Sequence, residues 1–201
     1  MISLKVSGDG QTPSFFKLYV RYMVSLRCKL IVRDELRKLG IEYQITDYGG
    51  IEFPEGLSTT QENELRENLQ NSGLELLGKS ESLLIDKIMN TIIDVIHYSE
   101  KLPDISYKEI IHENLGDSSE SILKIFSEVK GVSITQFIVD QKIEWAKELI
   151  LYEDLSLTEI AKNLKYRNVN LFISQFRKIT GLHPSYYVEL KENRAKNSVL
   201  Q

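Results

Sequence analysis

An internal repeat in the second half of the chain constrains the fold more than any other feature. Residues 104–110 align with residues 154–160 at an offset of 50, and the offset continues without a gap until Phe137 meets Tyr187. Each copy predicts a capped short helix, a turn, a second helix that begins near position 118 or 168, and a glycine stop. The repeat therefore predicts two helix-turn-helix units. A bundle of repeated helical hairpins with no role in nucleic-acid binding is the alternative that the spacing alone leaves open.

The two copies open with the same capping residues. Ser106 is followed by Glu109, and Ser156 is followed by Glu159, which is the spacing of a capping box. Two helix starts are therefore predicted from local sequence alone.

The second copy also carries a recognisable signature. Ile160-Ala161 is followed by Leu164-Lys165-Tyr166, by the segment Phe172–Lys178, by Thr180–Pro184 and by Tyr187. This segment resembles the signature of the AraC/XylS family of bacterial transcription regulators, and the resemblance continues to Arg194. It implies a protein that binds double-stranded DNA and has RNA polymerase as a partner. A cytoplasmic location is expected because the sequence shows neither a long apolar run nor the pattern of a signal peptide.

In that family a long helix joins the two helix-turn-helix subdomains, and Ile134–Leu151 corresponds to it here. At about 1.5 Å per residue this helix would be about 27 Å long, comparable to the ~34 Å between successive major-groove faces of B-DNA. The resemblance therefore implies that one chain can recognise two adjacent major grooves.

Helical geometry assigns a buried and an outward face to each predicted recognition helix. Phe172 and Phe176 are four residues apart and must face the core, as must Ile122 and Phe126 in the first copy. The remaining positions are the candidate DNA-binding residues: Ser119, Glu120, Ser121 and Lys124 in the first copy, and Arg167, Asn168, Val169, Asn170, Ile173, Ser174, Arg177 and Lys178 in the second.

These side chains suit different parts of a duplex. Asn170 can bond adenine through two hydrogen bonds, Ile173 or Val169 can contact a thymine methyl group, and Arg177 with its cationic neighbours can contact phosphates. The first helix has almost no positive charge, and Glu120 beside a phosphate would repel it. The first unit is therefore expected to bind DNA weakly or not at all.

Two positions depart from the family pattern. Lys165 stands where a turn glycine is common, which requires a backbone conformation that a residue with a side chain can tolerate. Ser174 stands where an arginine is often found. Both departures concern the strength of base recognition and not the fold.

Charge is distributed unevenly along the chain. The formal net charge is -4, but residues 155–201 carry eight basic and three acidic side chains, whereas residues 102–154 carry five and eleven. A basic segment in an acidic chain is typical of an element that binds a polyanion.

The first hundred residues predict an α/β domain. Alternating and helical apolar patterns follow one another in the order βαββαβ, which is the ferredoxin-like arrangement. In the first strand, Phe16, Leu18 and Val20 are expected to face the core, with Tyr19 on the opposite side. The expected domains are a ferredoxin-like domain over 1–79, a connector over 80–101 and the DNA-binding domain over 102–201.

A single cysteine lies between the first strand and the first helix. The segment Met23–Cys28 resembles the Met-x-Cys-x-x-Cys loop of heavy-metal-associated domains, but Ser25 replaces the first cysteine. Because one thiolate cannot complete a site for a soft ion, a structural Cys28 and no cofactor are favoured. A metal-responsive regulator that binds copper or zinc through Cys28, with a second chain providing the other thiolate, is the alternative.

The connector, Ser82–Ser99, has an apolar band too wide for a helix with one neighbour. It is expected to be the first core helix of the DNA-binding domain, or else to pair with itself in a homodimer. No apolar run approaches the ~20 residues that span a bilayer, so no membrane partner is expected. No nucleophile with a base, phosphate loop or metal-activated water motif indicates an enzyme. A protein-interaction module whose helix-turn-helix units no longer bind DNA is a further alternative.

Overall fold

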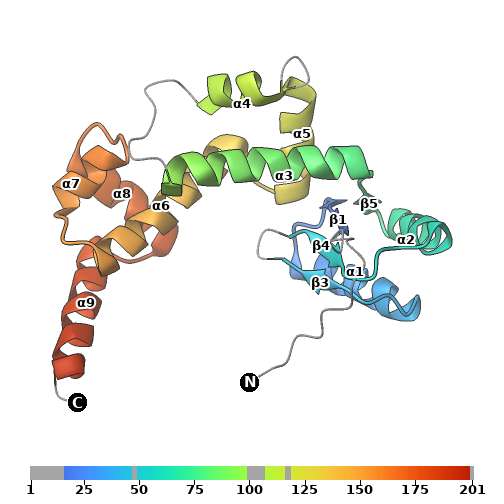
Figure 1. The fold of residues 1–201 in the computed structure, drawn as a ribbon, viewed down its shortest axis with the longest axis horizontal. Helices are drawn as coiled ribbons and strands as arrows, with labels where there is room; N and C mark the ends of the chain where they lie inside the picture. Colours follow the sequence, from blue (N-terminus) through green and yellow to red (C-terminus); the bar gives the residue numbers. More distant parts are fainter. Residues whose placement is uncertain (1–15, 47–48, 99–106, 116–118, 200–201) are drawn as a thin grey trace, which may run out of the picture. The chain divides into compact units, whose positions relative to one another are not determined.

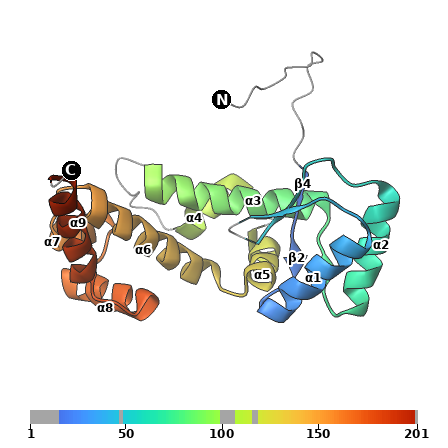
Figure 2. The same cartoon turned by 90° about the horizontal axis from the view of Figure 1, so that it is seen from below.

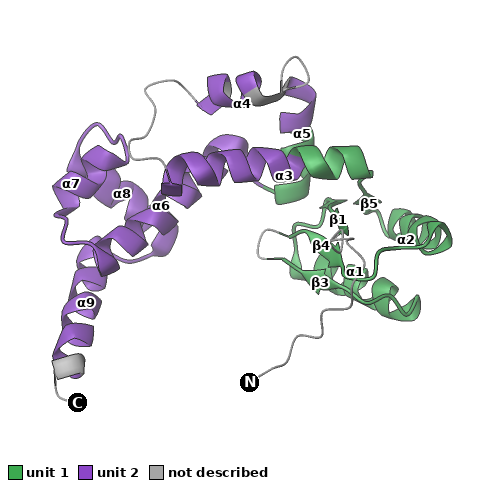
Figure 3. Ribbon diagram, in the orientation of Figure 1, with its two compact units in different colours: residues 1–84, 124–131 green, residues 85–123, 132–201 purple. Residues whose placement is uncertain are grey.

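A computed structural model describes residues 16–46, 49–98, 107–115 and 119–199, which fall into two compact units (Figure 3). Unit 1 comprises residues 1–84 and 124–131, and unit 2 comprises residues 85–123 and 132–201. Two helices therefore contribute residues to both units. The domain boundaries expected at residues 79 and 101 stay a prediction.

Among its described residues, unit 1 contains a three-stranded and a two-stranded antiparallel sheet, the helices α1 and α2, and parts of two further helices (Figure 1). Strand β1 pairs with β4, β4 pairs with β3, and β2 pairs with β5. The elements follow one another as strand, helix, two strands, helix and strand, and the first strand is divided in two. Their bounds are β1 Phe16–Leu18, β2 Val20–Arg21, α1 Leu26–Lys38, β3 Gln44–Ile45, β4 Ile51–Phe53, α2 Thr59–Asn71 and β5 Glu75–Leu76.

The core of unit 1 forms between the sheet and the apolar faces of α1 and α2. Val32 and Leu36 of α1 and Leu65 and Leu69 of α2 are fully buried, as their helical spacing requires. The Ser58 side chain accepts a hydrogen bond from the backbone of Gln61, and the two residues form a capping box at the start of α2. These contacts fix both helices on one side of the sheet.

The expectation that Tyr19 lies on an exposed face is wrong. Tyr19 is fully buried, as are Leu18 and Val20 on either side of it. Its backbone N–H donates to the buried Ser82 hydroxyl at 3.2 Å, and its carbonyl accepts from the Leu77 N–H at 2.8 Å. The start of α3 (Lys79–Ile93) therefore covers the face that an isolated strand would expose.

Unit 2 is helical. Helix α3 continues into a short π-helix, η1 (Asp94–Tyr98), and α4 (Tyr107–Leu115) with α5 (Ser119–Lys130) forms the first helix-turn-helix. Helix α6 (Ile134–Tyr152) leads to the second, α7 (Leu157–Asn163) with α8 (Val169–Thr180), and α9 (Pro184–Val199) follows. Helix α6 contacts α7, α8 and α9, and Figure 2 shows these elements gathered at the C-terminal end of the chain.

The structure confirms the long linker helix and one of the two capping boxes. Helix α6 has 19 residues and begins at Ile134, as expected. Ser156 and Glu159 form both hydrogen bonds of a capping box. Ser106 and Ser118, which were expected to cap the two helices of the first helix-turn-helix, lie outside the described residues.

The connector is a core helix of unit 2. Ile88, Met89 and Ile92 of α3 and Ile96 of η1 are buried, and the His97 ring lies 5.1 Å from the Trp145 ring of α6. Self-pairing of this helix in a homodimer stays a prediction. Among the described residues, no helix combines the length and the apolar character that crossing a membrane requires.

The turn of the second helix-turn-helix is held in a left-handed conformation. Lys165 has a φ of 58°, and the next backbone N–H, that of Tyr166, donates to the Ala161 carbonyl at 2.9 Å. A non-glycine residue is disfavoured at this φ because its Cβ approaches the following carbonyl. A lysine in place of glycine at position 165 therefore lowers the stability of the folded state.

Replacing Lys165 with glycine should relieve that cost. We expect Lys165→Gly to raise the free energy of unfolding by about 0.5–1 kcal/mol, because glycine adopts positive φ freely. Lys162→Gly, three residues earlier in α7, should instead lower it by about 0.5–1 kcal/mol. Urea denaturation followed by circular dichroism measures both, and a loss of stability in Lys165→Gly would contradict the assigned turn.

Candidate nucleic-acid interface

Helix α8 has defined ends that make it a rigid rod of 12 residues. At its start, the Asn168 side chain accepts a hydrogen bond from the Leu171 N–H at 2.9 Å. At its end, Gly181 has a φ of 75° and donates its N–H to the Arg177 carbonyl at 2.9 Å. A helix of this length spans about 18 Å, and its diameter of about 10–12 Å fits the ~12 Å width of a DNA major groove.

The faces of α8 agree with the sequence expectation. Phe172 and Phe176 are fully buried, whereas Val169 and Ile173 are partly buried at the edge of the core. The other predicted DNA-binding residues of the second helix-turn-helix are exposed: Arg167, Asn168, Asn170, Ser174, Arg177 and Lys178.

An open hollow of about 430 Å³ lies along the outward face of α8. It is lined by Asn170, Ile173, Ser174, Arg177, Lys178 and Gly181. The first five were all predicted as DNA-binding residues. The structure thus brings an amide, a small hydroxyl, an apolar side chain and two cations together on one surface. This mixture can contact both base edges and phosphates.

A row of aromatic rings lies on the buried side of α8, and two of the rings belong to α8 itself. The rings of Tyr166, Phe172, Phe176 and Tyr187 follow one another with centroid separations of 5.5, 5.8 and 5.3 Å, all edge to face. Such contacts favour a single arrangement of the rings. The two phenylalanines therefore fix the rotation of α8 about its axis, and that rotation decides which residues face outward.

Lys142 of α6 links the linker helix to the turn between α7 and α8. Its ammonium donates to the Leu164 carbonyl at 2.9 Å and lies 5.5 and 5.7 Å from the ring centroids of Tyr107 and Tyr166. Burial lowers the pKa of Lys142 and raises the pKa of each tyrosine to about 12. One cation thus contacts the first helix-turn-helix through Tyr107 and the second through Tyr166.

Sequence reasoning missed Lys142 and also missed Lys191 of α9. The Lys191 ammonium contacts the Glu153 carbonyl and the Asp154 carboxylate, both at 2.7 Å, and the hydrogen bond lowers the pKa of Asp154. Both lysines act through carbonyls distant in sequence, so no local pattern identifies them. Leu171, which is half exposed on α8, was also missed.

Helix α5, which the sequence predicts as the first recognition helix, differs from α8 in charge. Ile122 and Phe126 are buried as expected, and Glu120, Ser121 and Lys124 are exposed. The Ser119 side chain lies outside the described part of the chain. Lys124 is therefore the one cation among the predicted residues of this helix, against two on the hollow beside α8.

Cys28 lies in the first turn of α1, next to its N-cap. The Ser25 hydroxyl accepts a hydrogen bond from the Cys28 N–H at 3.3 Å and lies 3.1 Å from the thiol sulfur. The hydrogen bond with Ser25 lowers the pKa of Cys28. No cluster of three or more His, Cys, Asp or Glu side chains suited to a metal ion occurs among the described residues. The Ser25 hydroxyl beside the thiol is a poor ligand for a soft ion such as copper(I).

Residues 112–189 match the family of helix-turn-helix domains. The chain is 28% identical over 106 residues to YtdP, an HTH-type transcriptional regulator of Bacillus subtilis (strain 168), and 32% identical over 110 residues to an HTH-type transcriptional regulator of Staphylococcus aureus. These matches cover 53% and 54% of this chain but only 14% of each relative. The similarity is therefore confined to a small part of those proteins.

Solved structures are similar over about half of the chain. The C-terminal domain of AraT, a response regulator from Geobacillus stearothermophilus, is 23% identical and has a TM-score of 0.45, covering 53% of this chain and 84% of that one. A probable AraC family transcriptional regulator from Rhodopseudomonas palustris CGA009 is 20% identical and has a TM-score of 0.46, covering 55% and 98%.

The pKa values of Tyr107 and Tyr166 predict an alkaline loss of stability. Because both phenols keep their protons to about pH 12 in the folded chain but release them near pH 10 when unfolded, their contribution is complete below pH 10. It should be lost as the pH rises from 10 to 12. Thermal denaturation across this range measures the loss, and Tyr166→Phe should flatten it. An identical pH profile in that variant would contradict the burial of the hydroxyl.

Proposed function

We propose that this chain is a sequence-specific, DNA-binding transcriptional regulator of the AraC/XylS type, with α8 as its main recognition helix. The observation that carries the proposal is the hollow along α8, where five residues predicted from sequence line one surface. The helix-turn-helix match over residues 112–189 supports the same class of function.

The residues of α8 divide into two roles. Asn170 and Ile173 lie toward the first half of the helix, the part that contacts base edges in helix-turn-helix proteins. Arg177 and Lys178 lie in the last turn, where the helix dipole favours cations, and they contact phosphates together with Arg167. Asn168 caps the helix with its side-chain oxygen and has only its amide N–H groups left for DNA.

The linker helix α6 sets the separation of the two recognition helices. Its 19 residues span about 28 Å, close to the ~34 Å between successive major-groove faces. We propose that α5 meets the adjacent groove through Ser119, Ser121 and Lys124. Its contribution is small because Glu120 repels phosphates.

The element order and strand pairings of the N-terminal part support a ferredoxin-like domain. This fold occurs in proteins with many unrelated functions. We propose a cytoplasmic protein without enzymatic activity, with duplex DNA and RNA polymerase as its partners. The similarity to much longer regulators supports the regulatory role alone, so these partners are proposals for this chain.

Two other functions make different predictions. A metal-responsive regulator needs Cys28 and thiolates from a second chain, so a Cys28→Ala variant would lose copper or zinc binding that the wild type shows. A protein-interaction module without DNA binding would show no affinity for any duplex.

Removing the Arg177 side chain should weaken DNA binding through its phosphate contact. We expect Arg177→Ala to lower the affinity for a 24-base-pair random duplex and to reduce the slope of log affinity against log salt by about one. Fluorescence anisotropy at several salt concentrations measures both quantities. Arg37→Ala, which removes an exposed cation from α1, is the matched control and should leave the slope unchanged. An unchanged slope in Arg177→Ala would remove Arg177 from the interface.

Asn170 should determine sequence preference. Selection from a pool of random duplexes should give a preferred sequence with the wild-type chain, and Asn170→Ala should lose the preference for adenine at one position. The expected discrimination is about 1–3 kcal/mol, the value of a bidentate contact to a base. Identical selected sequences from both proteins would show that Asn170 does not contact a base.

A further inference from the structure

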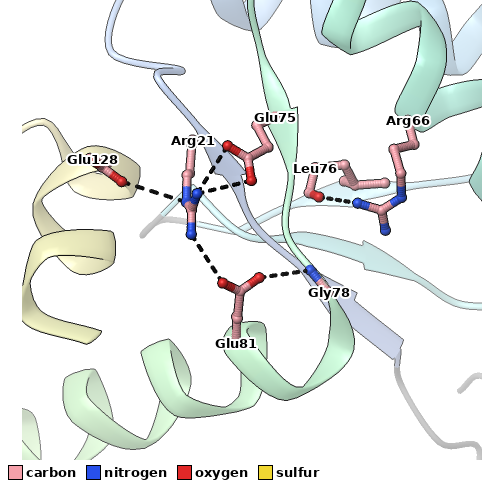
Figure 4. A network of polar contacts seen from close by, with 7 residues as sticks. All are labelled: Arg21, Arg66, Glu75, Leu76, Gly78, Glu81 and Glu128. Carbon is pink, nitrogen blue, oxygen red and sulfur yellow. Dashed lines mark hydrogen bonds and ion pairs between the residues drawn. The ribbon is translucent and has the colours of Figure 1, made fainter. Parts of the chain in front are cut away.

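Arg21 in β2 joins three separate segments of unit 1 (Figure 4). Its Nη1 donates to the carboxylate of Glu75 in β5 at 2.9 and 3.0 Å, and its Nη2 donates to Glu81 in α3 at 3.0 Å. Its Nε lies 3.6 Å from the Glu128 carboxylate of α5, an ion pair longer than a hydrogen bond. The Arg21 side chain is only 16% exposed, so salt screens these pairs less than it screens pairs on the surface.

The residues that follow Arg21 contact the same end of α5. The Tyr22 backbone N–H donates to the Glu128 carbonyl at 2.9 Å, while Tyr22 has a φ of 66°, which is uncommon for a residue with a side chain. At the end of α5, a Cβ on Gly131 would lie 2.8 Å from Val24 Cγ1, which is closer than a Cβ atom approaches a non-bonded heavy atom in proteins. Residues 21–24 therefore contact a side chain, a carbonyl and the terminal glycine of one helix.

These contacts lie where the chain passes from unit 1 to unit 2. The passages are at residues 84–85, 123–124 and 131–132. Glu81 precedes the first passage by three residues, Glu128 lies between the second and the third, and Gly131 lies at the third. The segment from Arg21 to Val24 thus contacts the chain close to its passages into the DNA-binding half.

We infer that Arg21 is a positioning residue for α5, the first recognition helix. It holds residues 124–131 of α5 within unit 1, among them the exposed Lys124. For its consequence in DNA binding the inference rests on the proposed function. The N-terminal part of the chain thereby controls the helix that meets the second groove.

Hydrogen exchange followed by mass spectrometry on the full chain tests whether Arg21 holds the end of α5 in place. We expect backbone amides of residues 127–131 to exchange at least fivefold faster in Arg21→Gln than in the wild type, and to a smaller extent faster in Glu128→Gln. The double variant should exchange no faster than Arg21→Gln, because the two residues share one interaction. Unchanged exchange in both single variants would overturn the inference.

Arg66 provides the matched control within the same unit. It contacts Glu62 at 3.0 Å and the Leu76 carbonyl, so Arg66→Gln removes an arginine from α2 and leaves the Arg21 contacts in place (Figure 4). Exchange in residues 127–131 should match the wild type in this variant. Faster exchange in Arg66→Gln, equal to that in Arg21→Gln, would indicate general loosening of unit 1 and would overturn a specific role for Arg21.

A second experiment tests the consequence for DNA. Lys124→Gln should measurably reduce the salt slope of binding to a 24-base-pair random duplex in the wild-type background, by less than the ~0.9 of one full phosphate contact. The reduction should be less than half as large in the Arg21→Gln background, because α5 is then no longer held in place. Equal reductions in the two backgrounds, or no effect of Lys124→Gln in the wild type, would overturn the positioning role. The proposed function is tested separately, by Arg177→Ala.

Discussion

The burial of Phe172 and Phe176 is the constraint on which the candidate interface depends. Both rings are fully buried and belong to a row of edge-to-face contacts that runs from Tyr166 to Tyr187. Because the two rings are one helical turn apart, their burial fixes the rotation of α8 and leaves Asn170, Ser174 and Arg177 on the outward face. The chemistry offered to a partner is therefore a direct consequence of core packing.

A second level of organisation comes from a few polar side chains that reach across the sequence. Lys142 contacts the turn before α8 and Tyr107 of the first helix-turn-helix, whereas Arg21 holds carboxylates from three segments of unit 1. Apolar burial is not directional, and it does not by itself set the angle between helices. Charged groups with several fixed partners add that geometric specificity.

The parts of the fold that sequence predicted well are those with local causes. Capping at Ser156 and the inward positions Phe172 and Phe176 follow from spacing within one or two helical turns, whereas the start of α6 at Ile134 was predicted from the family resemblance. Tyr19 was misplaced because its burial depends on Ser82, 63 residues away. The outward residues of α8 were predicted as a set from their helical spacing, and Lys142 was not predicted, since its partners lie on other helices. The ion pair between Arg21 of β2 and Glu128 of α5 was likewise not predicted, because no sequence period connects the two residues.

The central claim is that the outward face of α8 binds duplex DNA through phosphates and base edges. Its most direct test is a fluorescence anisotropy titration of the full chain against a 24-base-pair random duplex at four salt concentrations. We predict measurable binding at low salt and a linear fall of log affinity with log salt, because each phosphate contact releases counterions. Absence of binding at the lowest salt concentration, or an affinity independent of salt, would contradict the account and favour a protein-interaction module.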